Sequence, residues 1–136
     1  MAEAAVRVYP RDGKKNCAGT PRVCQPVADL ITRSDPKGVS ATRDPMFVTS
    51  HSPLGSFGGS LSAFDARLDQ NCIGVPKRCT PLWTTFLYTE DFAAPAIANG
   101  RIAVGGTNPG PMLNPACVCS VSPPRDVNRP IDVRRD

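Results

Sequence analysis

The feature that most constrains the fold is a repeated cysteine-bearing segment. Asn16–Val27 aligns with Asn71–Leu82 without a gap, and the two copies share the asparagine, both cysteines, a glycine and two prolines. The match extends upstream, where Val6–Tyr9 aligns with Leu61–Phe64. Because a match of this length at one fixed offset is typical of repeat architectures, we expect two copies of a single structural unit.

A second pattern also occurs twice, at an offset of 56 residues instead of 55. Val39–Val48 resembles Pro95–Val104. The second copy predicts two strands, at 96–98 and 101–105, joined by Asn99-Gly100. Asn-Gly is the dipeptide most favoured in a two-residue hairpin turn, so this segment predicts a β-hairpin.

Two further segments read as strands. Ser60–Asp65 alternates, with Leu61 expected to face inward and Ala63 or Phe64 less clearly so, and Pro81–Tyr88 is rich in β-branched and aromatic residues. The 15 prolines and 11 glycines interrupt the chain too often for long helices. The unit therefore runs strand, turn, strand, Gly-rich link, strand, cysteine loop and strand. Four antiparallel strands in a unit of about 40–55 residues are typical of one β-propeller blade.

These elements resemble the β-propeller repeat shared by pyrroloquinoline-quinone (PQQ) dehydrogenases and an outer-membrane assembly lipoprotein of the same repeat type. The residues that carry the resemblance are Leu82–Thr84, Pro95–Gly105, Gly58–Ser60 and Leu61–Ala66. The cysteine insertion is similar to a variant found between blades in bacterial exported repeat proteins. The resemblance implies an all-β fold, an incomplete β-propeller of about one and a half to two four-stranded antiparallel blades.

The resemblance also predicts the domain organisation. Residues 1–38 form a partial first repeat, residues 39–106 the second, PQQ-like repeat, and residues 107–136 an irregular, disordered tail rich in Pro and Arg. The first copy lacks the expected tryptophan, and the family pattern is lost after Gly106. We interpret this loss as a truncated or frame-shifted reading of a longer gene, so that the chain is a fragment.

Four of the six cysteines are expected to pair. Six intervening residues that include Gly and Pro allow disulfides between Cys17 and Cys24 and between Cys72 and Cys79. Two alternatives stay open, namely one zinc ion held by all four thiolates, and reduced thiols. The remaining two cysteines, in Cys117-Val-Cys119, are too close for a comfortable bridge and are expected to be unpaired.

The sequence offers no clear catalytic site, so we predict that the chain is not an enzyme and assign no cofactor. His51 is the only histidine, which excludes a multi-histidine metal site, and Glu90-Asp91 reads as a solvated turn. Gly105–Gly110 has no lysine at the spacing of a phosphate-binding loop. Trp83 could stack on a quinone in the dehydrogenase branch of the family, but its expected role is to anchor a strand in the core.

Charge and hydropathy exclude other classes. The net charge of +4 is spread, with eight Lys and Arg against five acids in residues 1–45, four against four in 46–121 and four against three in 122–136. Clustered basic residues would be expected in a protein that binds nucleic acid, so we predict no nucleic acid partner. No apolar run approaches the roughly 20 residues of a membrane helix. No signal peptide is visible, although the cysteines and the family favour a periplasmic or secreted location.

The predicted function is a non-catalytic binding or scaffold module from a PQQ-like repeat protein, part of a longer exported protein. Its partners would be another protein or the remaining blades of a propeller, with self-association as a further expectation. The alternatives are a fragment of a quinone-dependent dehydrogenase and an inactive product of a truncated gene.

Overall fold

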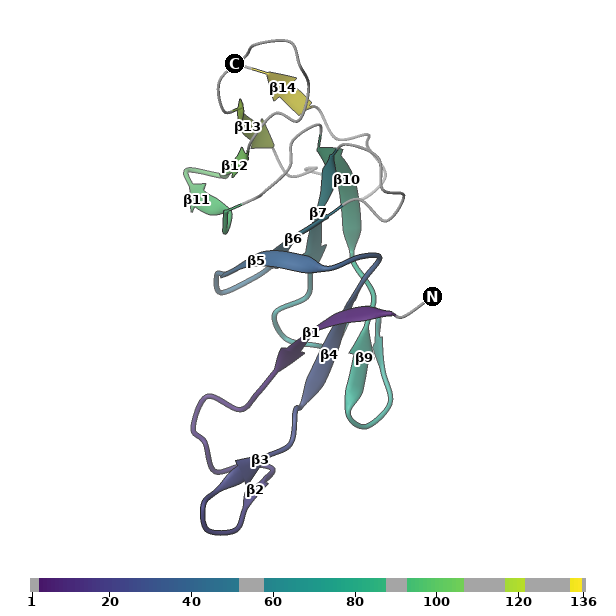
Figure 1. Ribbon diagram of the computed structural model, residues 1–136, viewed down its shortest axis with the longest axis vertical. Helices are drawn as coiled ribbons and strands as arrows, with labels where there is room; N and C mark the ends of the chain where they lie inside the picture. Colours follow the sequence, from purple (N-terminus) through teal and green to yellow (C-terminus); the bar gives the residue numbers. More distant parts are fainter. Residues whose placement is uncertain (1–2, 52–57, 88–92, 107–116, 122–132, 136) are drawn as a thin grey trace.

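A computed structural model describes residues 3–51, 58–87 and 93–106, together with the backbone of strands at 117–121 and 133–135. In this part of the chain all regular structure is β, and no residue lies in a helix long and apolar enough to cross a membrane. The strands form three four-stranded sheets and one two-stranded sheet, mostly antiparallel, and none of them closes on itself (Figure 1). The prediction of an all-β fold is confirmed.

The first sheet takes strands from both copies of the repeat. Its order is β1 (Ala4–Val8), β4 (Ala28–Thr32), β9 (Lys77–Cys79) and β8 (Cys72–Ile73). Strand β9 pairs with β4 in parallel, whereas the other neighbours are antiparallel. The first copy's cysteine hairpin, β2 (Cys17–Ala18) and β3 (Val23–Cys24), forms a sheet of its own.

The second sheet is a meander of four antiparallel strands. Its order follows the chain: β5 (Pro36–Ala41), β6 (Met46–His51), β7 (Gly59–Phe64) and β10 (Trp83–Leu87). In the chain, the β8–β9 hairpin follows β7 and precedes β10, and it belongs to the first sheet. The predicted succession of strand, turn, strand, link, strand, cysteine loop and strand is confirmed here.

The third sheet repeats this order with β11 (Ala96–Ala98), β12 (Arg101–Gly106), β13 (Cys117–Val121) and β14 (Val133–Arg135). Asn99 and Gly100 have φ values of 49° and 70°, as the predicted two-residue turn requires. The prediction of a disordered tail is wrong for β13 and β14. Strand β12 offers an unpaired edge of N–H and C=O groups, which the valine-rich segment Cys117–Val121 satisfies.

The strand pairings show that the repeat is structural. Val6 lies opposite Leu30 in the first sheet, and Leu61 lies opposite Thr85 in the second, each 55 positions later. The 56-residue offset also holds, because the pair Ala41–Met46 of the β5–β6 hairpin corresponds to the pair Ile97–Ile102 of the β11–β12 hairpin. The second hairpin simply adds one more pair and has a tighter turn.

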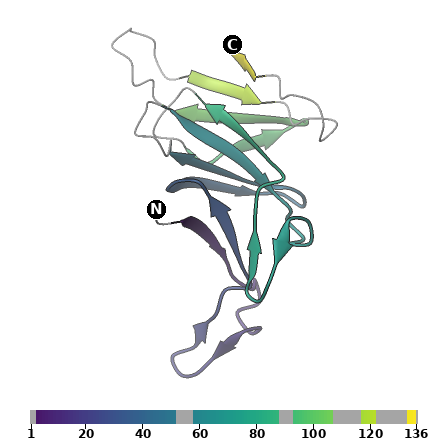
Figure 2. The same ribbon diagram turned by 90° about the vertical axis from the view of Figure 1, so that its right-hand side faces the viewer.

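The three larger sheets stack face to face along the long axis of the molecule (Figures 1 and 2). Alternate residues of a strand point to opposite faces, so the second sheet contributes to two cores. The core between the second and third sheets consists of Phe47, Leu61, Ala63, Leu87, Ile102 and Val104. The core between the first and second sheets consists of Val48, Phe64, Ala28, Leu30 and Cys79. Leu61, Ala63 and Phe64 are therefore all buried, which explains why alternation alone did not single out one inward face.

Candidate functional site

The two cysteine hairpins have the same local structure. Disulfides join Cys17 to Cys24 and Cys72 to Cys79, with Cα separations of 3.9 and 4.0 Å. The asparagine before each first cysteine has a positive φ, 56° at Asn16 and 57° at Asn71. Asparagine tolerates this left-handed conformation better than most residues, which explains why both copies carry it.

The surroundings of the two hairpins differ. The second hairpin is docked on the first sheet, where the Lys77 N–H donates to the carbonyl of Val27 at 3.1 Å and Cys79 is 1% exposed. In the first hairpin, Val23 is 63% exposed and Cys24 is half-buried. Figure 1 shows this hairpin projecting from one end of the molecule. The second hairpin is thus docked on a sheet, whereas the first has no neighbouring sheet among the described residues.

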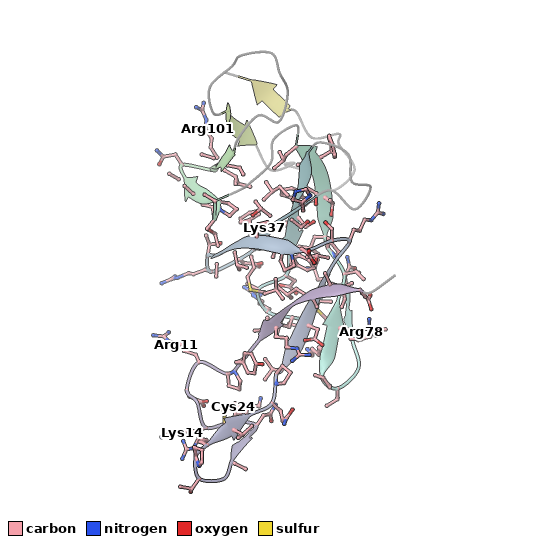
Figure 3. The ribbon with its side chains drawn as sticks, in the orientation of Figure 1. Arg11, Lys14, Cys24, Lys37, Arg78 and Arg101 are labelled. Atoms are coloured by element: carbon pink, nitrogen blue, oxygen red, sulfur yellow. A yellow bond between two sulfur atoms is a disulfide. The ribbon has the colours of Figure 1, made fainter. Side chains whose placement is uncertain are left out.

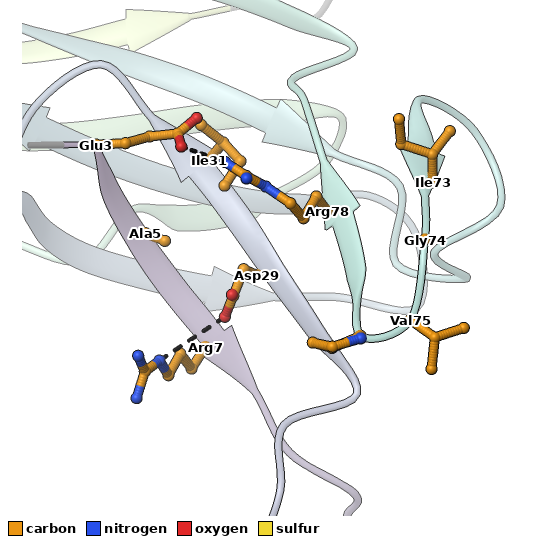
Figure 4. Close-up of a pocket in the computed structure, with 10 residues that line it drawn as sticks. Glu3, Ala5, Arg7, Asp29, Ile31, Ile73, Gly74, Val75 and Arg78 are labelled. Carbon is orange, nitrogen blue, oxygen red and sulfur yellow. Dashed lines mark hydrogen bonds and ion pairs between the residues drawn. The ribbon is translucent and has the colours of Figure 1, made fainter.

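A groove of about 760 Å³ lies on the outer face of the first sheet, between β1, β4 and the tip of the second hairpin (Figure 4). Two ion pairs cross its floor, Arg7 with Asp29 at 3.8 Å and Arg78 with Glu3. The hairpin tip adds Ile73 and Val75, which are strongly exposed apolar side chains. Charged groups beside exposed apolar ones suit the binding of a protein segment better than chemical catalysis.

The repeat alignment shows that this face differs from its counterpart. Arg7 and Asp29 correspond to Ser62 and Thr84 in the second sheet, whose hydroxyls lie 2.9 Å apart, with Ser62 buried and Thr84 exposed. A pair of neutral hydroxyls in the second sheet thus stands where the first sheet has a pair of opposite charges. Since burying charges is costly, the outer face of the first sheet is suited to solvent or a polar partner.

The loop before the second hairpin is organised by Asp65. Its carboxylate accepts backbone N–H bonds from Gln70 at 2.7 Å, Asp69 at 2.9 Å and Arg67 at 3.0 Å. These bonds, led by the one from Gln70, lower the pKa of Asp65 below its usual value near 3.8. In the sequence, Asp65 lies within Leu61–Ala66, one of the segments that carry the resemblance, and the resemblance predicts no role for it. In the structure it holds the loop that positions the docked hairpin.

We expect Asp65→Asn to lower stability at neutral pH. Because the folded pKa is depressed, the stabilisation is complete above the unfolded pKa of about 3.9 and is lost as pH falls through the lower folded pKa. The difference in Tm between the wild type and the variant should therefore be constant from about pH 7 to pH 5 and shrink as pH falls below about 4. Asp69→Asn, which removes an exposed carboxylate from the same loop, is the control. Parallel Tm curves for wild type and Asp65→Asn at every pH would contradict this role.

The structure places the other residues singled out from the sequence as follows. Trp83 is half-buried against the core shared with the third sheet, its ring 5.9 Å from that of Phe47, in the anchoring position expected for it. His51 ends β6, where its N–H donates to the carbonyl of Asp35. Residues 90–91 and 107–110 lie outside the described residues, and of Cys117 and Cys119 only the backbone, on β13, is described.

Among the described residues, no three His, Cys, Asp or Glu side chains gather as ligands of a metal ion would. The four paired cysteines form two disulfides instead of a shared thiolate cluster. Comparison with protein-family models, with curated proteins and with solved structures finds no match.

Proposed function

We propose that this chain is a non-catalytic binding or scaffold module built from stacked blade-type sheets of a PQQ-like β-propeller repeat. In its full context it would belong to an exported protein. The cysteine hairpins would then act as clasps between consecutive blades, and the open groove and the free hairpin as contact surfaces.

One observation carries the proposal. The second sheet packs on the first through Val48 and Phe64, and the third packs on the second through Ile102 and Val104. Val48 and Val104 are equivalent positions of the hairpin repeat. Each sheet thus presents the same face to the sheet before it, and this is how successive blades follow one another in a propeller.

The hairpin docking supports the same proposal. Strand β9 belongs to the second repeat by sequence but extends the first sheet, so it joins two consecutive units through backbone hydrogen bonds. A disulfide restricts this hairpin to one shape. Such a link stiffens the stack, which favours a scaffold over a module that must move in order to work.

A dye-reduction assay separates this proposal from a quinone-dependent dehydrogenase. The full chain is incubated with pyrroloquinoline quinone, Ca²⁺ and either a primary alcohol or an aldose, and bleaching of the dye is followed. We expect no rate above that of quinone and Ca²⁺ without protein. Turnover that requires the chain and saturates with substrate would overturn the non-catalytic function.

A further inference from the structure

The docked Cys72–Cys79 hairpin indicates what kind of surface a hairpin of this motif binds. Strand β9 lies parallel to β4, with Arg78 opposite Asp29 and Cys79 opposite Leu30. Arg78 also forms an ion pair with Glu3, at the start of β1. The acceptor in this chain is therefore a sheet edge that supplies a backbone acceptor and one carboxylate, that of Glu3, to a basic hairpin, whereas the Asp29 carboxylate pairs with Arg7.

The free hairpin offers the same backbone. Arg22, Val23 and Cys24 occupy the positions of Lys77, Arg78 and Cys79. Strand β3 pairs with β2 on one side and with no described strand on the other. An edge of unpaired N–H and C=O groups is able to add to another sheet, as β9 does.

The free hairpin is also the more basic of the two. Arg11, Lys14, Lys15 and Arg22 surround it, and Arg11 and Lys14 lie at the same end of the molecule as Cys24 (Figure 3). The single acid, Asp12, already accepts bonds from the backbone N–H groups of Lys14 and Lys15. The side chains of the four basic residues therefore outnumber the available carboxylates.

We propose that the Cys17–Cys24 hairpin is a docking element for a protein partner that presents an exposed β-strand edge bearing carboxylates. The partner strand adds parallel to β3, in the register that β4 shows with β9. This inference deepens the proposed binding function but does not depend on the propeller assignment, because its precedent is the docked hairpin.

The test uses a synthetic copy of the known acceptor edge. Glu3–Val8 and Ala28–Arg33, which contain the paired strands β1 and β4, are joined at both ends by Asn-Gly into a cyclic peptide. It is titrated into the full, ¹⁵N-labelled chain. We expect saturable shift changes at the amides of 22–25 and none at those of 77–80, which are already docked.

Charge is tested on both sides. A peptide with Glu3→Gln and Asp29→Asn should bind about 2- to 10-fold more weakly, because exposed charge pairs contribute little individually. Arg22→Glu in the protein should weaken binding of the acidic peptide by a similar factor. Arg43→Glu makes the same charge change in the exposed β5–β6 turn and should leave binding unchanged.

Several results would overturn the proposal. These are absence of shifts at 22–25, equal binding of the neutral peptide, the same shifts caused more strongly by a short DNA duplex, or concentration-dependent shifts at 22–25 without peptide. The last result would assign the edge to a second copy of the chain. None of them depends on the dye-reduction result, so failure of this inference and failure of the proposed function are distinguishable.

Discussion

Phe64→Ala is expected to lower the free energy of unfolding by about 3–5 kcal/mol, the largest effect of any single substitution considered for this chain. Phe64 is fully buried between the first and second sheets, where it packs with Ala28, Leu30 and Val48. Removing the ring deletes apolar contacts from both sheets and leaves a cavity that two hydrogen-bonded sheets cannot easily fill. Urea denaturation followed by circular dichroism measures the change.

The repeat supplies a matched control for this substitution. Tyr9 occupies the position of Phe64 in the first copy but is 49% exposed. Tyr9→Ala should therefore cost less than about 1 kcal/mol, because little apolar surface is buried there. Equal losses for the two variants would show that the first two sheets do not stack through Phe64, and the proposed scaffold would lose its main support.

Removal of the two disulfides is expected to have unequal effects. The double variant Cys72→Ala, Cys79→Ala should lose about 2–4 kcal/mol, because the unfolded chain gains loop entropy and the buried Cys79 side chain is lost from the core. In the folded state this hairpin stays ordered by its pairing with β4, so the entropy gain is confined to the unfolded state.

The double variant Cys17→Ala, Cys24→Ala is the control, and it should cost less than about 1 kcal/mol. Its loop has the same length, but the hairpin has no packing partner among the described residues, so it gains freedom in the folded state as well as in the unfolded one. Urea denaturation of both double variants under identical conditions tests the asymmetry. A larger loss for the Cys17→Ala, Cys24→Ala variant than for the Cys72→Ala, Cys79→Ala variant would contradict the docked state of the second hairpin and the free state of the first.

The candidate site could be predicted from the sequence only in part. Sequence comparison identified both hairpins and their cysteines, but it treated the second hairpin as a loop between units. The groove on the first sheet was missed, although an indication was present in the alignment. Arg7 and Asp29 stand where the second copy has Ser62 and Thr84, and a paired change from hydroxyls to opposite charges indicates that the two sheet faces differ in polarity.

The sequence by itself determined the local features of this protein. Asn99-Gly100 specified a hairpin turn, the shared Asn, Gly and Cys positions specified two equivalent clasped hairpins, and the 55- and 56-residue offsets specified the register of the repeat. Each of these depends on residues close in the chain, where steric limits and short loops leave few alternatives.

Only the tertiary structure decided which units meet. The parallel pairing of β9 with β4 joins residues about 50 positions apart, and the ion pair of Arg78 with Glu3 joins residues 75 apart. The same hairpin motif occurs in a docked and in a free state. The presence of a neighbouring edge decides between them, because backbone hydrogen bonds and burial of Cys79 are gained only when that edge is there.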